Sequence, residues 1–256
     1  MNLELKDQLF LIGGATSGFG KAVAEALIRE SAKVIVVARG KEKLQEQYAN
    51  KPLAEIVEGD ITQHATIEQL KKVVGDRQLH GILVNAGGPP AKTVLETTLE
   101  DWDDAYQKIL RWKVELTQAF VPAMMKAGYG RLVYVESSSV KQPIENLVLS
   151  TSLRLAVVGM VKTLSQEIAK SGVTLNILGP GSHNTPAIDR LYVKKSEQTG
   201  LPFDDVKKNA IQQIPVGALG QADDFASLAV WLLSKSSRYI TGQTILVDGG
   251  MVKGTL

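Results

Sequence analysis

Short runs of apolar residues alternate with longer stretches of helical periodicity along most of this chain. Gln8–Gly13 is a continuous apolar run that ends in glycines, which is typical of a strand buried on both faces. Gly20–Glu30 then has helical spacing, with Val23, Leu27 and Ile28 on one face. The same pattern predicts further strands at Lys33–Ala38, Glu55–Glu58, His80–Asn85, Arg131–Val135, Thr174–Leu178 and Thr244–Val247. It predicts further helices at Lys41–Tyr48, Ile67–Val74, Leu99–Lys126 (interrupted only by Pro122 near its end), Ser150–Lys170 and Ala222–Ser234.

This alternation predicts the α/β class. Repeated β-α-β units require parallel strands with helices packed on both sheet faces. No linker, low-complexity tract or short internal repeat divides the chain, so we expect one Rossmann-like, doubly wound domain over residues 1–256. The one irregular region, Gly181 to Ile214, is polar and punctuated by glycine and proline, which predicts a substrate loop or lid. In such sheets ligands bind at the carboxyl ends of the strands.

A glycine-rich segment, GGATSGFG, lies between the first predicted strand and the first predicted helix. Gly14, Gly18 and Gly20 allow a tight turn and a close backbone approach to a pyrophosphate, at a helix N-terminus that attracts anions. Thr16 and Ser17 add hydroxyl donors. The alternative is a plain glycine-rich turn, but the position between strand and helix favours dinucleotide binding.

The end of the second predicted strand distinguishes NAD from NADP. An acidic residue there normally binds the ribose hydroxyls of NAD, whereas an arginine accommodates the 2′-phosphate of NADP. This chain has Ala38-Arg39, which offers a guanidinium and no carboxylate to repel a phosphate. We therefore expect NADP(H) as the cofactor, the alternative being that Arg39 is an ordinary solvated side chain.

Composition narrows the possible classes further. The 256 residues include 29 Lys and Arg against 27 Asp and Glu, a formal net charge of +2, and no basic stripe that would favour nucleic acid. With 44% hydrophobic residues the chain can bury a full core. The absence of cysteine excludes disulfides and thiolate catalysis, and three widely separated histidines predict no metal site.

We expect a cytoplasmic protein with a small-molecule substrate and no membrane partner. The apolar stretches fall short of the roughly 20 residues that a membrane span needs. The N-terminal sequence MNLELKDQLFLIGG has neither the basic region nor the cleavage site of a secretion signal.

Several motifs, in their order along the chain, resemble those of the short-chain dehydrogenase/reductase family nearly from end to end. Besides the glycine loop they are Gly59-Asp60-Ile61, Val84-Asn85-Ala86-Gly87, Gly130-Arg131-Leu132-Val133, Gly179-Pro180-Gly181 through Thr185, Tyr239-Ile240-Thr241-Gly242-Gln243 and Val247-Asp248-Gly249-Gly250. The resemblance implies an oxidoreductase that binds a dinucleotide. It implies a cofactor site formed by Gly14, Thr16, Ser17, Gly18, Phe19, Gly20, Ala38, Arg39, Asp60, Ile61, Asn85, Ala86, Gly87, Pro180, Gly181 and Thr185.

The catalytic positions depart from that family's pattern. The family uses a serine, a tyrosine thirteen residues later, a lysine four residues after the tyrosine, and an asparagine on the preceding long helix. Ser137 fits the serine position, but the tyrosine position holds Ser150, the lysine position holds Arg154 and the asparagine position falls on Ile109. Three of the four catalytic residues are therefore absent. The segments SSVKQP and LSTSLR are similar to a divergent subgroup without the Tyr/Lys pair, whose members are commonly labelled 3-oxoacyl-carrier-protein reductases.

These replacements change the available chemistry. A tyrosine with an ordinary pKa of about 10 can become a proton donor near neutral pH when positive charge lies beside it. A serine hydroxyl is not an ordinary titrating group, and Arg154 stays charged, so neither can replace that donor. Arg154 can orient a substrate, stabilise an oxyanion, or hold a carboxylate or phosphate.

Other polar residues are candidates with alternatives. Lys141 lies in the loop after Ser137, and Lys113 lies one turn beyond Ile109 on the same helix, although each could be an ordinary solvated lysine. Glu136 could be a buried acid beside the site or could simply end a strand and bind water. His183 could donate a proton or be polar surface. We expect Trp102 and Trp112 to pack between helices and Trp231 to lie in the core or an interface.

The sequence thus predicts an NADP(H)-dependent oxidoreductase for a small carbonyl or conjugated enone. Ser137 would bind the carbonyl oxygen, Arg154 and Lys141 would hold an anionic part or developing charge, and Ser150 would order a water molecule. The alternative is a non-catalytic NADP(H)-binding sensor or scaffold. The resemblance also predicts a homo-oligomer, a tetramer, and the two longest predicted helices carry apolar residues on more than one face.

Overall fold

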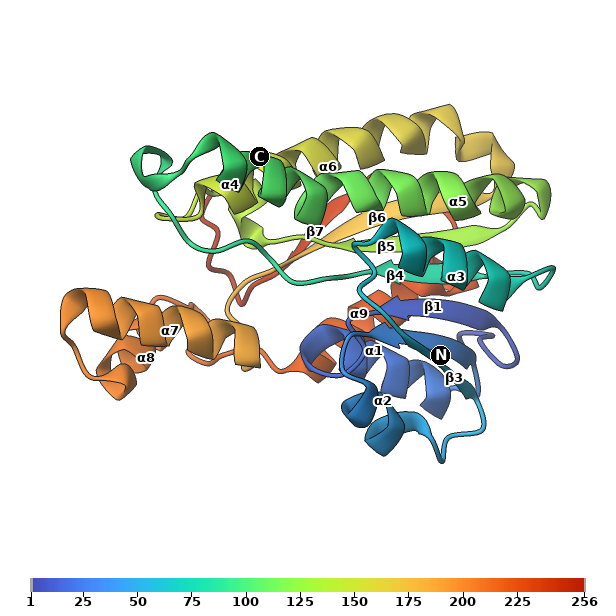
Figure 1. Ribbon diagram of the computed structural model, residues 1–256, viewed down its shortest axis with the longest axis horizontal. Coiled ribbons are helices and arrows are strands. Elements are labelled where there is room, and N and C mark those ends of the chain that lie inside the picture. The colour runs from blue at the N-terminus through green and yellow to red at the C-terminus, as the bar shows by residue number, and fades with distance from the viewer. Residues whose placement is uncertain (1, 256) are drawn as a thin grey trace.

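The computed structural model describes residues 2–255, apart from the side chain of Ala187, so the two terminal residues of the domain expected over 1–256 lie outside it. Its centre is a seven-stranded sheet in the order β3-β2-β1-β4-β5-β6-β7, and every pair of neighbours is parallel (Figure 1). The strands are β1 Leu9–Gly13, β2 Lys33–Ala38, β3 Ala54–Glu58, β4 Gly81–Val84, β5 Gly130–Val135, β6 Val173–Pro180 and β7 Thr244–Val247. This arrangement confirms the predicted doubly wound α/β fold.

Helices cover both faces of this sheet, as the alternation predicted. The chain builds β1, β2 and β3 outward in one direction and then returns to place β4 on the other side of β1. The carboxyl ends of β1 and β4 therefore border the crevice where such sheets bind ligands. One face carries α1 Gly18–Arg29, α2 Lys41–Tyr48 and α9 Ala222–Leu233, and the other carries α3 His64–Val74, α4 Leu99–Tyr106, α5 Trp112–Lys126 and α6 Val148–Glu167 (Figure 1).

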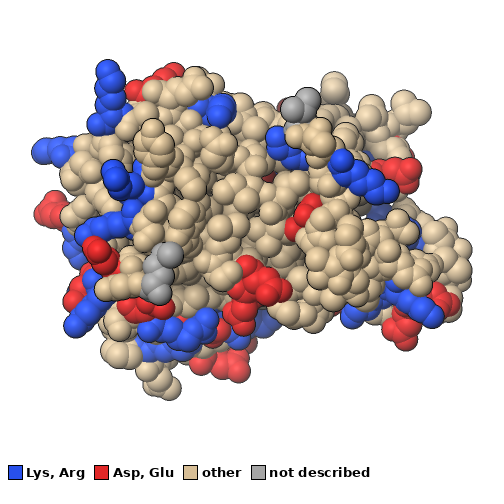
Figure 2. Space-filling view, turned by 180° about the vertical axis from the view of Figure 1, so that it is seen from behind, with Lys and Arg blue, Asp and Glu red and all other residues tan. Residues whose placement is uncertain are grey.

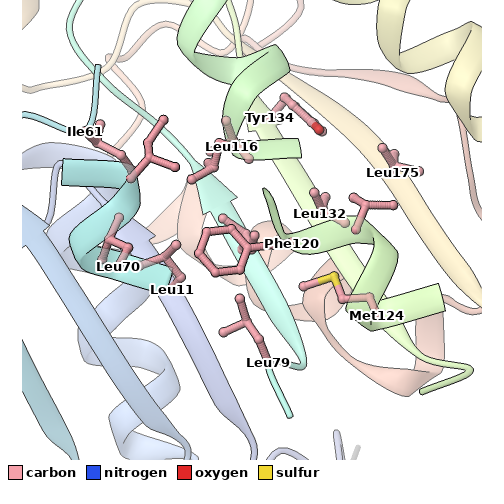
Figure 3. Packing of buried hydrophobic residues seen from close by; sticks show 14 of the residues in the cluster. Leu11, Ile61, Leu70, Leu79, Leu116, Phe120, Met124, Leu132, Tyr134 and Leu175 are labelled. Atoms are coloured by element: carbon pink, nitrogen blue, oxygen red, sulfur yellow. The ribbon is translucent and has the colours of Figure 1, made fainter. Parts of the chain in front are cut away.

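The buried strands explain why the sheet has two cores. Successive side chains of a strand point to opposite faces, so Leu9 and Leu11 of β1 join one apolar cluster whereas Phe10 and Ile12 join the other. Figure 3 shows the first cluster, with side chains of α3 and α5 meeting those of the sheet. Because both faces of β1 are apolar, its continuous hydrophobic run matches its burial.

The long helix predicted over Leu99–Lys126 is irregular at a different place from the one expected. Pro122 lies inside α5, which continues to Lys126. The irregularity is a π-helical turn at Gln107–Arg111, between α4 and α5, and it includes the buried Ile109. Such widened turns are frequent at functional sites, and this one precedes Lys113.

The region Gly181–Ile214 is not the irregular excursion that its polar composition suggested. It folds into α7 Pro186–Thr199 and α8 Phe203–Gln212, an arm at the end of the molecule where α4 also begins (left in Figure 1). The two helices pack on each other, with the rings of Tyr192 and Phe203 6.3 Å apart between centroids. Pro186 at the start of α7 and the left-handed Gly200 after its end are the helix signals that the composition concealed.

By length and composition alone, α6 is long and apolar enough to cross a membrane, and no other helix among the described residues is. This differs from the expectation that every apolar stretch falls short of that length. Val157 and Val161 of this helix pack in the core over the sheet, which accounts for part of its apolar character. Only 33% of its apolar stretch is buried, so much of the helix lies on the surface.

On the face in Figure 2, acidic and basic side chains are interspersed around a largely uncharged centre.

Candidate active site

The glycine loop and the end of β4 meet at the crevice beside β1. Asn85 donates a hydrogen bond of 3.1 Å from Nδ2 to the carbonyl oxygen of Gly13. Gly14 has a φ of +65°, and a Cβ there would lie 2.8 Å from Asn85 Nδ2. A Cβ on Gly20 would collide with the carbonyl oxygens of Gly13 and Gly14. Glycine is therefore required at both positions, and the loop leaves its backbone open to a ligand.

The start of α1 is free to bind an anion. The side chain of Ser17, which precedes α1, does not cap it, so the first amide groups of the helix keep no side-chain acceptor. Thr185 brings the distant segment after β6 against this loop, because a Cβ on Gly18 would lie 3.5 Å from its methyl group. Two predicted parts of the cofactor site thus lie in contact, and Thr16 lies in the same loop.

The remaining predicted cofactor residues surround this crevice. Gly181 donates a hydrogen bond of 2.9 Å to Val247, which places the end of β6 beside β7. Ala86 is half-buried and Gly87 exposed after β4, whereas Ile61 is 4% exposed and belongs to the core. The ring of Phe19 packs edge to face against His183 at 5.0 Å between centroids. His183 is buried rather than polar surface, because this ring and Phe225 pack against it.

Arg39 lies exposed directly after the end of β2. Its side chain is 82% exposed, and its Nη1 forms a long ion pair of 4.0 Å with Asp60 Oδ2. Asp60 Oδ1 accepts hydrogen bonds from the amide and hydroxyl of Thr62, which orient the carboxylate. Ala38, the last residue of β2, presents no competing acid. The guanidinium is therefore available to an anion.

Three of the four predicted catalytic residues lie at the carboxyl end of β5: Ser137, Ser150 and Arg154. Ser137 follows the strand, and its Oγ accepts a hydrogen bond of 3.1 Å from the amide of Ser139. Arg154 of α6 donates from Nε to Ser150 Oγ at 3.0 Å and from Nη1 to the carbonyl oxygen of Val135 at 3.1 Å. Ser150 and Arg154 are each 8% exposed, so this part of the site excludes most water.

Glu136 and Lys113 also belong to this site, where both form buried ion pairs. Glu136 is 3% exposed and binds Arg154 Nη1 through Oε2 at 2.9 Å. Its other oxygen pairs with Lys113, which is 2% exposed. Burial lowers the pKa of Lys113 to about 8, because desolvation and the nearby Arg154 outweigh the attraction of Glu136. Lys113 is thus no solvated lysine, and Glu136 binds cations rather than water.

Lys141 lies away from this buried group. It is exposed in the loop after the short 3₁₀ helix Ser138–Val140, and its side chain makes no ion pair or hydrogen bond within residues 2–255.

The three tryptophans have packing roles, as expected. Trp112 is buried in the core, the indole of Trp102 donates to Thr97, and Trp231 packs on the cluster under α9.

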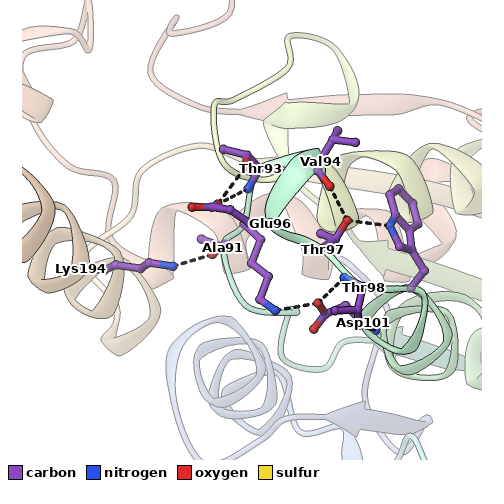
Figure 4. Close-up of polar contacts among 10 residues, drawn as sticks. Ala91, Thr93, Val94, Glu96, Thr97, Thr98, Asp101 and Lys194 are labelled. Atoms are coloured by element: carbon purple, nitrogen blue, oxygen red, sulfur yellow. Dashed lines mark hydrogen bonds and ion pairs between the residues drawn. The ribbon is translucent and has the colours of Figure 1, made fainter.

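The loop between β4 and α4 is held in place by several polar contacts (Figure 4). Lys194 of α7 donates a hydrogen bond of 2.5 Å to the carbonyl oxygen of Ala91, and Lys92 pairs with Asp101 of α4 at 2.6 Å. Within the loop, Thr93 donates hydrogen bonds from its amide at 2.8 Å and from its hydroxyl at 2.9 Å to the carboxylate of Glu96. The helical arm therefore contacts the loop that follows the Asn85-Ala86-Gly87 motif.

The sequence matches a protein-family model along most of its length. That model is described as "Enoyl-(Acyl carrier protein) reductase", and it matches residues 14–252. The 3-oxoacyl-[acyl-carrier-protein] reductase FabG of Escherichia coli is 30% identical over 98% of this chain and 99% of its own. Dehydrogenase/reductase SDR family member 6 of Xenopus laevis is also 30% identical, over 96% of this chain and 98% of its own.

Solved structures resemble the whole fold. The actinorhodin polyketide ketoreductase with NADPH superimposes with a TM-score of 0.91 at 26% identity, over 97% of this chain and 98% of its own. The L-sorbose reductase of Gluconobacter frateurii, complexed with NADPH and L-sorbose, superimposes with a TM-score of 0.92 over 99% of this chain and 100% of its own. At 23% identity the latter supports the fold alone.

Proposed function

Because this chain belongs to the short-chain dehydrogenase/reductase family, a family of oxidoreductases, we propose that it uses NADP(H) to reduce a small carbonyl or conjugated enone. Three features of the crevice fit the cofactor: the two glycines that a Cβ would block, the uncapped start of α1 and the exposed Arg39. Bound NADPH would supply a hydride. The protein's own residues must then manage the negative charge that forms on the substrate.

The observation that carries this proposal is the buried cation at the position of the family's lysine. Arg154 is anchored by Ser150, Val135 and Glu136, so its orientation is set before a substrate binds. A preorganised cation stabilises an oxyanion more strongly in a site that excludes water than in solution. Ser137 would donate its hydroxyl proton in a hydrogen bond to the same oxygen, because its Oγ accepts from Ser139 and keeps its hydrogen free.

The same residues favour a conjugated substrate over a saturated ketone. Reduction of a ketone forms an alkoxide that needs a proton donor, and Arg154 cannot supply a proton. Hydride addition to the β-carbon of an enone forms an enolate, which Arg154 and Ser137 would stabilise until water protonates it. Ser150, which accepts from Arg154, keeps a hydroxyl hydrogen with which to order that water. Lys141 would act only on an anionic group near the entrance, because it is exposed.

A reductase screen tests the proposal most directly. NADPH absorbance would be followed with matched pairs of substrates, cyclohexenone against cyclohexanone and 3-penten-2-one against 2-pentanone. We expect turnover of the enones and a much lower rate with the saturated ketones. Rapid reduction of the saturated ketones that survives in Arg154→Ala would contradict this assignment of the site.

The competing function is a non-catalytic NADP(H)-binding sensor or scaffold. The observation that favours it is that Glu136 already neutralises part of the charge on Arg154, as a purely structural network would. Binding of NADPH without oxidation of the cofactor by any member of the two panels would support this alternative.

We also propose a cytoplasmic homo-oligomer, a tetramer, that binds neither nucleic acid nor membrane. The formal charge of +2 and the mixed charges in Figure 2 support the absence of a polyanion partner. An apolar hollow of about 400 Å³ lies between α5 and α6 on the surface, lined by residues such as Val114, Met160 and Leu164. A second copy of the chain would cover this surface, which also includes the unburied part of α6.

A further inference from the structure

The buried charges of the site do not cancel, because they comprise two cations and one anion. Glu136 uses one carboxylate oxygen for Lys113 and the other for Arg154, so two cations share one anion. All three side chains are at most 10% exposed. With Lys113 protonated the group carries a net charge of +1. A buried charge without a partner is costly, so this group favours an anion that arrives from outside the chain.

One nitrogen of Arg154 is free to meet such an anion. Nε and Nη1 donate to Ser150, Val135 and Glu136, whereas Nη2 has no hydrogen-bond partner among residues 2–255. Although it has no partner, Nη2 is not fully buried, so part of it reaches the accessible surface. The side chain is thus nine-tenths buried, and one of its donor groups is left without a hydrogen-bond partner among the described residues.

Gly88 is the opening through which that nitrogen is reached. It is exposed and follows the Asn85-Ala86-Gly87 motif at the crevice, and a Cβ there would lie 3.4 Å from Arg154 Nη2. A Cβ at this position would be in van der Waals contact with the nitrogen, and a branched side chain would extend further over it. Since the glycine carries none, a ligand in the crevice has access to the guanidinium.

We propose that Arg154 binds a carboxylate which the substrate carries in addition to its reacting carbonyl or enone. The substrate is then an oxo acid or an unsaturated oxo acid rather than a neutral ketone. This inference rests on the proposed function. A carboxylate fits because its single charge equals the net charge of the buried group, and because that charge is present in the resting complex, not only during reaction. Lys113 and Glu136 act as positioning residues that hold Arg154.

Binding without turnover tests this inference. The protein saturated with NADP⁺ would be titrated calorimetrically with 2-oxobutanoate, acetoacetate and 4-oxopentanoate, each compared with its neutral methyl ester. In these acids the carboxylate is attached directly to the ketone, or lies one or two methylenes away. We expect at least one acid to bind about 10-fold or more tightly than its ester, as a hydrogen bond to a charged group contributes.

Three variants locate the effect. Arg154→Gln should remove the preference for the acid, and Gly88→Val should remove it while leaving the buried ions intact. The matched control is Arg131→Gln, since Arg131 is equally buried but lies at the other end of β5 and donates only to the carbonyl oxygens of Gly130, Gly172 and Ser234. This control should keep the preference. If Arg154→Gln fails to fold, Gly88→Val still decides the question.

The outcomes separate this inference from the proposed function. Equal affinity for acid and ester throughout the panel would overturn the inference, even if neutral enones were reduced. A loss of NADPH affinity in Arg154→Gln as large as the loss of acid binding would also overturn it, because Nη2 would then serve the cofactor. Acid binding that depends on Gly88 and Arg154, without any turnover, would uphold the carboxylate site and reject the reductase.

Discussion

Arg154 donates a hydrogen bond of 2.9 Å to Glu136, and both side chains are buried at the carboxyl end of β5. An exposed pair of this kind would contribute little. Here each charge has lost most of its hydration, so each depends on its partner. The pair should therefore contribute both to the stability of the fold and to the orientation of Arg154.

Glu136→Gln should be strongly destabilising. It would leave Lys113 and Arg154 as two buried cations without an anion, and removing one partner of a buried pair typically costs about 3 to 5 kcal/mol. Lys113→Met should cost less, because Glu136 and Arg154 then remain as a neutral pair. Urea unfolding at pH 7 would measure both variants against the wild type. A loss below about 1 kcal/mol for Glu136→Gln would show that water reaches these groups.

Stability should depend on the protonation of Lys113. Burial lowers its pKa to about 8 in the folded state, against an ordinary value of 10.5 in the unfolded chain. Between these values the unfolded state binds more protons, so the contribution of Lys113 to stability rises with pH across that interval and is constant below about pH 8. The charged groups that face Lys113 are Glu136 from the end of β5 and Arg154 from α6.

Comparison with Lys113→Met isolates this effect from other titrating groups. The difference in unfolding free energy between wild type and variant should shift in favour of the wild type as the pH rises from 7.5 to about 9.5. A pH-independent difference would mean that Lys113 keeps its ordinary pKa in the folded protein.

NADPH should bind more tightly than NADH. Arg39 is exposed at the end of β2 with only a long contact to Asp60, so its guanidinium can hold the 2′-phosphate. Calorimetric titration should show at least about a 10-fold preference, in the range expected for a charge-assisted hydrogen bond. Arg39→Asp should lose most of this preference, whereas Lys43→Asp, three residues into α2 on the exposed side, serves as the charge-matched control. Equal affinities in the wild type would exclude the assignment.

Restoring the family's pair should change the substrate preference. Ser150→Tyr combined with Arg154→Lys would introduce a proton donor and should raise the reduction of saturated ketones, since a well-placed general acid contributes about 10²- to 10⁴-fold. The gain should fall short of that range because Ile109 still replaces the asparagine. Steady-state rates with cyclohexanone and cyclohexenone would be compared with those of each single variant. An unchanged ratio would show that the two positions do not control proton delivery.

The oligomer should be sensitive to Gly159. This residue of α6 lines the apolar hollow beside α5, and a Cβ on it would meet no atom within 4 Å, so a larger side chain does not disturb the monomer. Gly159→Arg should therefore shift the mass in light scattering from oligomer toward monomer while the melting of secondary structure stays cooperative. A monomeric wild type at micromolar concentration would refute the proposed assembly.

The amino-acid pattern predicted the parallel sheet, the helices that cover its two faces and a glycine loop after β1. These features depend on local patterns: Leu9 to Ile12 are apolar because both faces of β1 are covered, and Gly14 and Gly20 are glycine because any side chain would collide with the neighbouring backbone. Counting from Ser137 also led to Ser150 and Arg154 as candidates, because the spacing along the loop and helix is itself local, and their catalytic roles stay predictions.

The charge of the site could not be predicted from local patterns, because the fold brings its charged side chains together from separate elements. A lone Lys113 on a helix indicates a solvated side chain, since burying an unpaired charge is costly, and its partner Glu136 lies 23 positions away on another element. Apolar periodicity did not predict α7 and α8 either, because these helices bury few apolar residues and pack mainly on each other. Periodicity reports which face of an element is apolar, but it does not report which distant side chain makes a buried charge tolerable.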